Sequence, residues 1–539
     1  MMIENFSHSA QSYLDASSMV LRTVLHSSND CSVEILDFAP RLELFGRSFH
    51  GALLLRRIRP LQGNPLICVR CRPTFDYNTI YPDISSGSNH IRYLSSSQTL
   101  RMTTDLSISC VFKETTIVLD EPKHLIIGTD ESLTKGIVEL FERFLQNTQT
   151  HWKTFSHALT LPVEWQDEVM RSAMVLNALC YQDTGLFVAA CTSGIPGKKR
   201  QSGLDGRFCL MRDAAIVTRA MCRLNMTQAL DQYLRALNSL VVKTVSSKQS
   251  LPPCVSIQLD RVTAEEEAKY LAGYRGIGTV KIGAPEWLQE SHTEVYGSVI
   301  YALALAFYDH RVGLHERADE KLFGVLEALG YAAFDLHDKP GYSSFIQPAS
   351  VGDKHVHTVA VLYCWLACTQ LLNIARKLLQ RGFDCTCKVA EWESRVDTLE
   401  TYINTKCVKN GVYTAFAAAD GHEYESKPHP SLLLMHIFGF SRRNSDTFQR
   451  TLEALSASES LIVNSAYLFW LVEAKAVRQP EDARRLLLSL LRCRSGGGLF
   501  AAYLDLSDHS LWGNLPDAQS TAAMISAAFA VSTDWNEVL

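Results

Sequence analysis

The chain has 539 residues, of which 47% are hydrophobic, and its formal net charge at pH 7 is −5. This composition is typical of a globular protein with a large core and a few domain-sized units. Basic and acidic side chains are interspersed, so neither a nucleic-acid-binding surface nor an acidic disordered arm is indicated.

Residues 1–18 lack the basic and then apolar segments of a secretory signal. No stretch reaches the roughly eighteen uninterrupted apolar residues of a membrane span. The fifteen cysteines are scattered and odd in number, which is typical of a reducing compartment rather than of a disulfide framework. We therefore expect a cytoplasmic protein that contacts no membrane.

Residues 18–130 contain short β-rich runs separated by Asn, Asp, Gly, Ser and Pro, which is typical of strands and turns. The runs are SMVLRTVLH, CSVEILDFAP, ALLLRRIRPL, PLICVRCRPTF, IRYLS, ISCVFK and TIVLDEPKHLIIGTD. They predict a β-sandwich-like domain over residues 1–130. Cys68 and Cys71 lie in one of these runs, where residues three apart point to opposite faces of a strand. Without a second pair at ligand spacing, we interpret them as structural rather than as zinc or redox residues.

The periodicity changes to 3.6 after residue 130, and residues 132–155 predict one amphipathic helix with Leu140, Phe141 and Phe144 on one side. This segment gives a linker helix region over residues 131–160.

About a dozen helical segments follow over residues 161–539. Some are apolar on nearly every face, such as VAVLYCWLACTQLL, and others carry a single stripe, such as DARRLLLSLLRCR. Enclosed and half-exposed helices together favour two concentric rings. The long loops 194–210, 252–290 and 338–356 are where a site is expected.

Several segments resemble a known family in the same order along the chain. SGLDGRFCLMRDA is similar to the family segment NWDYRYCWLRDA, YLAGYRG to its GYRG loop, VHTVAVLYCW to VHTFSSVMCW, and GLFAAYLDLSDHSLWGNLPDAQS to GLLSEDIDPATGELWGNFPQ. LRTVLH, ILDFAPR, RRIRPL and RCRPTFDY resemble its β-domain. The family is glycoside hydrolase family fifteen, the glucoamylase and trehalase type. The resemblance implies an N-terminal antiparallel β-sandwich, a linker helix and a mainly α (α/α)6 barrel with a pocket at one end.

The resemblance also implies two carboxylates that this sequence lacks. Inverting glycoside hydrolysis needs a general acid and a general base roughly 6.5–9.5 Å apart. The acid is the Glu of a GIWE motif, and here GYSS places Ser344 on it; no Asp or Glu occurs between Gly341 and Gly352. The base is the Glu of the SED motif, and here Ala502 stands on it. We therefore expect a degenerate member that does not hydrolyse glycosides, since each group is typically worth a factor of about 10² to 10⁴.

The pocket implied by the resemblance has also lost aromatic side chains, which are replaced by Leu204, Gly206, Leu210 and Ser343. Arg212 and Asp213 match the pair that holds sugar hydroxyls in the family. Two interpretations of this pair stand side by side: a ligand contact, or a buried ion pair at a helix start.

We expect Arg212, His357 and Tyr503 to be the catalytic donors, although a lone histidine is more often structural. The remaining candidates line or flank the implied pocket and are taken as substrate-binding. They are Asp205, Arg207, Leu210, Asp213, Tyr274, Arg275, Tyr342, Ser343, Ser344, Thr358, His429, Ala502 and Trp512.

The leading functional hypothesis is a repurposed pocket that binds an apolar or polycyclic small molecule rather than a sugar. It would promote a cofactor-independent isomerisation or cyclisation, such as a Diels–Alder-type step in natural-product biosynthesis, through orientation and one or two hydrogen-bond donors. The alternatives are a carbohydrate-binding or scaffolding protein without turnover, and a residual glycoside hydrolase. No cofactor, metal or nucleic-acid motif is present. The sequence leaves the oligomeric state open.

Overall fold

The computed structural model describes residues 1–44, 47–197, 203–350, 352–418, 427–442, 445–457 and 462–538. The predicted site loop 194–210 therefore lies in part, over residues 198–202, outside the described residues. The chain forms two compact units: Met1–Leu159 with Gly496–Gly498, and Thr160–Ser495 with Leu499–Leu539. The predicted division into 1–130, 131–160 and 161–539 stays a prediction.

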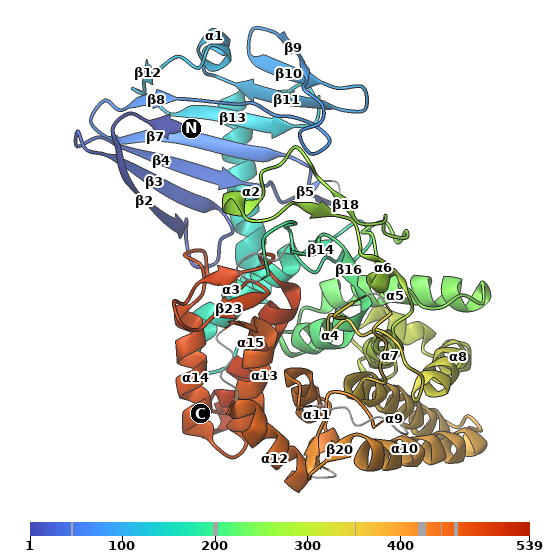
Figure 1. The fold of residues 1–539 in the computed structure, drawn as a ribbon. Coiled ribbons are helices and arrows are strands. Elements are labelled where there is room, and N and C mark those ends of the chain that lie inside the picture. The colour runs from blue at the N-terminus through green and yellow to red at the C-terminus, as the bar shows by residue number, and fades with distance from the viewer. Residues whose placement is uncertain are drawn as a thin grey trace. The chain divides into compact units, whose positions relative to one another are not determined.

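The first unit is an antiparallel β-sandwich (Figure 1). Its larger sheet has the strand order β2-β3-β4-β7-β13-β11-β10-β9, and its smaller sheet has the order β1-β8-β12. Ile3, Ile67 and Leu119 of the small-sheet side share one hydrophobic core with residues of the large sheet such as Ile35 and Ile58. The strands of these two sheets are β1 Met2–Ile3, β2 Phe6–Tyr13, β3 Leu21–Ser27, β4 Ser32–Phe38, β7 Leu54–Gln62, β8 Leu66–Cys68, β9 Asp83–Ser86, β10 His90–Leu94, β11 Thr99–Thr104, β12 Ile117–Val118 and β13 Lys123–Gly128, and β5 Leu42–Leu44 pairs separately with β6 Arg47–Phe49.

Two local predictions in this unit are wrong. The run ISCVFK is the short helix α1, Ile108–Phe112, and not a strand. Only Val111 is buried in this five-residue run, and one buried side chain fits the period of a strand as well as that of a helix. The apolar pattern therefore could not distinguish a strand from a helix. Strand β8 ends at Cys68, so Cys71 lies beyond it. All fifteen cysteines are free thiols.

The predicted amphipathic helix is α2, Ile137–His157. Its buried residues Phe141 and Leu145 pack with Leu36 and Leu55 of the large sheet in a second core. The stripe of apolar side chains at helical spacing is thus what fixes α2 to this sheet.

The second unit is an (α/α)6 barrel, in which outer and inner helices alternate along the described chain (Figure 1). Each inner helix contacts the next in the order α4, α7, α9, α11, α13 and α15, and α15 contacts α4 and so closes the ring. The contact between α9 and α11 is made through the short turn that precedes α11. The outer helices are α3 Gln166–Ala178, α5 Thr227–Ser246, α8 Glu320–Leu336, α10 Thr386–Lys406, α12 Ser445–Ser456 and α14 Pro480–Arg492. The inner helices are α4 Ala214–Arg223, α7 Thr293–Tyr308, α9 Thr358–Gln380, α11 Leu434–Ile437, α13 Ser465–Ala476 and α15 Ala518–Val531.

Burial explains why the inner helices are apolar on nearly every face. Helix α9 is long and apolar enough to span a membrane by length and composition, but 83% of its apolar window is buried inside the structure. An apolar helix that is enclosed by other helices is a core element.

A glycine permits the close approach of α7 and α9. A Cβ atom on Gly297 would lie 2.0 Å from the backbone oxygen of Tyr363. We predict that Gly297→Ala lowers the free energy of unfolding by about 3 kcal/mol, near the upper end of overpacking costs, because backbone rather than a movable side chain blocks the new atom. Gly324→Ala on α8 is the matched control. Nothing lies within 4 Å of its added Cβ, so the better helix propensity of alanine should stabilise by about 0.5–1 kcal/mol. Denaturant titration of both variants measures this, and equal effects would contradict the packing argument.

Candidate functional site

The candidate site is built by the segments that lead into three inner helices. Arg212 and Asp213 lie in the turn Met211–Asp213 before α4, and Ser344 lies in the loop before α9. Ala502 directly precedes β23, Tyr503–Asp505, and Tyr503 begins it, both before α15. Because inner helices of an alternating barrel run in the same direction, the segments before them meet at one end. Segments distant in sequence therefore supply neighbouring side chains.

Arg212 is the centre of this cluster. Its Nε donates to Oδ1 of Asp213 at 3.1 Å, its Nη1 donates to the backbone oxygen of Ser344, and its guanidinium lies 5.3 Å from the ring centroid of Phe345. The side chain is 17% exposed, and no hydrogen bond joins Nη2 to any described residue. One donor of Arg212 thus stays available to a ligand.

Asp213 is enclosed more tightly, with 7% of its side chain exposed. It accepts a hydrogen bond from Nε2 of Gln519 at 2.9 Å as well as the bond from Arg212. Burial raises the pKa of Asp213, and Arg212 opposes part of that rise. The structure thus shows the ion pair at the helix start, with Asp213 as its buried partner and Arg212 partly open, and a ligand contact of the pair stays a prediction.

A carboxylate reaches the position of Ser344 from another helix. Oε1 of Glu294, in the first turn of α7, accepts from the backbone N–H of Ser344 at 2.6 Å and from Oγ of Ser343 at 3.1 Å. His292, the N-cap residue of α7, lies beside it, with Nδ1 3.6 Å from Oε1 of Glu294. The sequence search around Gly341–Gly352 missed this group because it lies about fifty residues earlier in the chain.

Glu294 is an anion rather than an acid. Burial alone would raise its pKa, but hydrogen bonding and electrostatic contact with His292, together with the N–H of Ser344, lower the pKa to about 2. A group that is ionised throughout the neutral range cannot protonate a leaving oxygen. Glu294 is therefore unsuited to the general-acid role that the family resemblance assigns to the position of Ser344.

A second carboxyl group lies near Ala502. This group is Asp517, and its backbone N–H donates to the backbone oxygen of Phe500. The Asp517 carboxylate caps α15, because it accepts from the N–H of Ser520 at 2.7 Å and from Oγ of Ser520 at 2.5 Å. Burial raises the pKa of Asp517 to about 6, and the charge of Asp213 adds to the rise. Sequence analysis missed Asp517, although the signal was there: the resembling family segment has Gln where this chain has Asp.

Tyr503 is the second available donor. It is half-buried, and its hydroxyl has no hydrogen-bond partner among the described residues. Burial raises its pKa, so the hydroxyl keeps its proton at neutral pH. Its ring is seated against Gly513, where an added Cβ would lie 2.8 Å from Cδ2 of the ring and where φ is +76°.

The ring nitrogens of His357 and His429 are engaged in hydrogen bonds to the protein backbone. Nε2 of His357 donates to the backbone oxygen of Gly341 at 3.2 Å, while Nδ1 of His429 accepts from the N–H of Ser431 at 3.2 Å as the cap of a short turn. Burial lowers the pKa of each histidine to about 4. Both rings are therefore neutral at pH 7, and the N–H of His357 that was predicted as a donor is already engaged.

Several predicted residues hold the framework instead of converging on Arg212. Asp205 pairs with Arg207 at 2.8 Å and also accepts from the N–H of Gly283. Tyr274 is exposed on its loop, and the guanidinium of Arg275 lies over the Tyr274 ring, 5.2 Å from the ring centroid. Four other predicted side chains contact their own surroundings. The hydroxyl of Tyr342 accepts from the N–H of Gly352, and Nε1 of Trp512 donates to Oγ of Ser510. Thr358 is buried at the start of α9, and Leu210 packs near Cys254.

The family model of glycosyl hydrolases family 15 matches residues 164–468, more than half of the chain. This chain belongs to glycosyl hydrolase family 15. The match covers most of the barrel, including Arg212, Asp213, Glu294 and Ser344.

Relatives of this family 15 chain include trehalases. The Mycobacterium tuberculosis trehalase is 22% identical over an alignment of 511 positions, and the match covers 88% of this chain and 72% of the trehalase. The Thermoplasma acidophilum trehalase is 24% identical over an alignment of 414 positions, and the match covers 71% of this chain and 66% of that protein. A bacterial glucoamylase crystallised with acarbose has the same fold, with a TM-score of 0.68 at 11% identity over 98% of this chain and 86% of its own.

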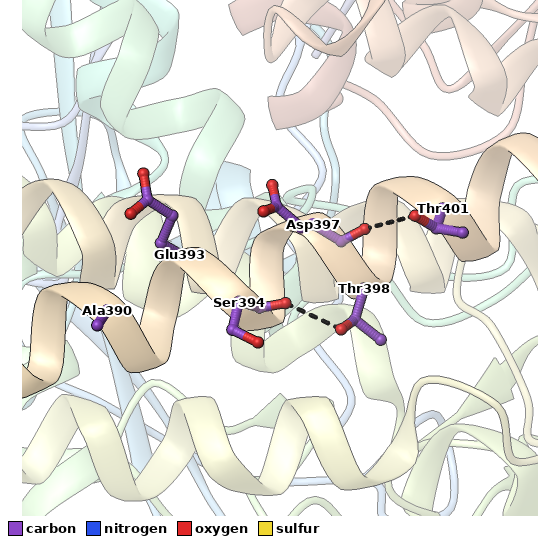
Figure 2. Close-up of a pocket in the computed structure, with 6 residues that line it drawn as sticks. All are labelled: Ala390, Glu393, Ser394, Asp397, Thr398 and Thr401. Carbon is purple, nitrogen blue, oxygen red and sulfur yellow. Dashed lines mark hydrogen bonds between the residues drawn. The ribbon is translucent and has the colours of Figure 1, made fainter.

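A surface hollow of about 650 Å³ lies elsewhere on the family 15 barrel. Figure 2 shows that its lining comes from one face of α10, including Glu393, Ser394 and Asp397. All six lining residues are exposed, and none of them is a predicted site residue. Within the described ranges, no three His, Cys, Asp or Glu side chains are grouped to hold a metal ion.

The neutral state of His429 gives the family 15 barrel a pH-dependent stability. The pKa of His429 is about 4 in the folded state against an ordinary 6.5, so the unfolded chain binds more protons between these values and stability falls as the pH drops through that window. We predict that His429→Asn removes about 1–2 kcal/mol of the stability lost between pH 7.5 and pH 4.5, since the ring is half-buried and partly screened. Asparagine keeps an oxygen for the N–H of Ser431. Thermal unfolding at both pH values measures the difference, and an unchanged acid loss in the variant would contradict it.

Proposed function

We propose that the barrel binds a largely apolar small molecule and promotes a cofactor-independent isomerisation or cyclisation, for example a Diels–Alder-type step, instead of glycoside hydrolysis. The observation that carries this proposal is the replacement of paired carboxylates by paired neutral or cationic donors. Ser344 and Ala502 stand where the family resemblance places the acid and the base, while Nη2 of Arg212 and the hydroxyl of Tyr503 have no partner among the described residues.

The available groups suit a reaction that needs orientation and polarisation. Ala502 and Tyr503 are half-buried, and Tyr503 lies within electrostatic range of the partly open Arg212, so an apolar ligand would cover apolar surface while its carbonyl oxygen met one or two donors. Donors fixed in place before the reaction stabilise developing negative charge without reorganisation, and holding two reacting parts together removes much of the entropic barrier. Neither effect needs a carboxylate pair.

A second candidate is carbohydrate binding without turnover. The Arg212–Asp213 pair is the observation that favours it, because the resemblance assigns these residues to sugar hydroxyls and because Gln519 and Arg212 hold Asp213 in a fixed position. The trehalase relatives also support a sugar as ligand. A residual glycoside hydrolase is the third candidate, and it would have to use Asp517 as a relocated acid.

Ligand-induced stabilisation distinguishes the first two candidates. A bound ligand raises stability by RT ln(1 + [L]/Kd), so millimolar ligand reveals weak binding. Thermal unfolding is measured with α-tetralone or 2-decalone and, in parallel, with trehalose and maltose. The proposal predicts that the cyclic ketones raise Tm of the wild type and that Tyr503→Phe reduces this shift, whereas Tyr274→Phe, on an exposed loop, leaves it intact. Stabilisation by the sugars alone would favour the second candidate.

A further inference from the structure

Strand β2 forms one edge of the large sheet (Figure 1). It pairs with β3 on one side, and among the described residues no strand pairs with its other side. Seven of its eight residues are exposed. The N–H of Leu14 donates to the backbone oxygen of Val20, at the pair that continues this ladder beyond the start of β3. Because the bonding direction alternates along an antiparallel strand, the backbone groups of Ser9 and Gln11 point away from β3. Strand β2 thus offers these donors and acceptors to a further strand.

The regular part of β2 lacks the features that protect sheet edges. Natural edge strands are short, or carry charged residues, proline or a bulge, because an open edge otherwise pairs with another chain. The register between β2 and β3 shifts once, between Phe6 and His8, and it is regular from His8 to Tyr13. The sequence of this stretch, HSAQSY, contains no Asp, Glu, Lys, Arg or Pro. Its composition therefore does not oppose the addition of a strand.

The other edges of the two sheets differ from β2. At the opposite edge of the large sheet, β9 has four residues and begins with Asp83. The small sheet ends in β1 and β12, which have two residues each. Short or charged strands such as these are typical of edges that stay in contact with solvent. Strand β2 is thus the edge of these sheets that is suited to pairing.

A second copy of this chain matches β2 in both hydrogen bonding and charge. Two identical antiparallel strands are related by a two-fold axis, so each outward donor of one strand meets an outward acceptor of the other. With Ala10 on the axis, Ser9 of each copy pairs with Gln11 of the other. Ala10 has the smallest side chain in the strand, which suits the axis, because the Cα atoms of that pair approach to about 4.5 Å. Since the stretch has no acidic, lysine or arginine side chains, the pairing brings no such like charges together.

We propose that the chain forms a two-fold dimer in which β2 pairs antiparallel with β2 of a second copy, with Ala10 on the axis. The two large sheets then continue into one sheet across the dimer. Backbone hydrogen bonds hold the two strands together, as they do when an extended segment adds to a sheet edge. The dimer is independent of the proposed function, because Arg212, Ser344 and Tyr503 lie in the other compact unit.

The mass of the purified full chain in solution tests the dimer. Size-exclusion chromatography with light scattering, at micromolar protein, should give twice the mass of one chain for the wild type. Ala10→Lys places two like charges directly opposite each other, which destabilises a strand pair, so this variant should have the mass of one chain. Ser86→Lys, at an exposed position of β9 on the opposite edge, is the matched control and should keep the double mass.

Charge complementation distinguishes loss of the interface from misfolding. Ala10→Glu alone should also have the mass of one chain. An equimolar mixture of Ala10→Lys and Ala10→Glu should regain twice that mass, because opposite charges then face each other. A wild type with the mass of one chain would overturn the inference, as would an Ala10→Lys variant that keeps the double mass. A mixture that stays at the mass of one chain would contradict the register centred on Ala10.

A disulfide across the axis provides a second measurement. The Cβ atoms of directly opposed residues in an antiparallel pair lie about 4.5–5.5 Å apart, close to the separation that a disulfide spans. Mild oxidation of Ala10→Cys should therefore yield a covalently linked dimer on a non-reducing gel. The wild type, whose exposed thiols are Cys191 and Cys387, and Ser86→Cys measure the background. Linkage of Ala10→Cys no greater than this background would count against the dimer.

Discussion

Replacing Arg212 with methionine should lower the free energy of unfolding by about 3–5 kcal/mol, the cost of removing one partner from a buried ion pair. Methionine keeps an unbranched apolar side chain against Phe345 but leaves Asp213 with Gln519 as its remaining partner. It also frees the backbone oxygen of Ser344. The barrel should therefore lose stability through an unpaired acid rather than through a cavity.

The matched control for this prediction is Arg485→Met on α14. Arg485 pairs with Asp482 at the surface, with 77% of the arginine side chain exposed, so its loss should cost under about 1 kcal/mol. Denaturant titration at pH 7 compares the two variants. Equal losses would mean that Arg212 is solvated and that the pair with Asp213 does not support the site.

Glu294→Gln should lower the free energy of unfolding by about 2–3 kcal/mol at pH 7. The pKa of Glu294 is lowered from 4.5 to about 2 in the folded protein, and one pKa unit corresponds to about 1.4 kcal/mol. Because the folded-state pKa is the lower one, this stabilisation is complete above pH 4.5 and is lost as the pH falls through about 2. Glutamine has the same size and keeps one oxygen for the N–H of Ser344.

The pH dependence separates charge from shape in this second prediction. Denaturant titrations of wild type and Glu294→Gln are made at pH 7 and at pH 3, where the carboxylate contributes less. The gap between the two proteins should narrow at the lower pH. A gap of the same size at both pH values would mean that steric misfit, and not the loss of an anion, destabilises the variant.

The fold was predictable because its signals are long or repeated. Apolar segments such as 359–372 are enclosed in the inner ring, and the stripe on α2 packs on the sheet as its spacing indicates. Strand β2, Phe6–Tyr13, escaped prediction because it is exposed on both faces and so shows no alternation. The five residues of α1 were too few to distinguish a helix from a strand.

The site was predictable only where one segment contributes the decisive residue. The resemblance placed Arg212, Asp213, Ser344, Ala502 and Tyr503 on segments that do meet before the inner helices. Glu294 and His292 were missed because their link to Ser344 joins residues about fifty positions apart.

A warning signal did exist for these missed residues. An acidic residue in the first turn of an otherwise apolar helix such as α7 must be buried with a partner. Asp517 was missed for a different reason. An Asp before Ala-Gln-Ser is a typical helix N-cap, so the sequence gives this residue an ordinary structural role.

The most direct test of the account is glucose release from trehalose, maltose and isomaltose by the purified full chain. The assay is run between pH 5 and 7, where a carboxyl with the pKa of Asp517, about 6, would be partly protonated. The account predicts no glucose above the protein-free background for the wild type and for Asp517→Asn. Glucose released by the wild type and lost in Asp517→Asn would contradict it, because hydrolysis would then proceed with a relocated acid despite Ser344 and Ala502.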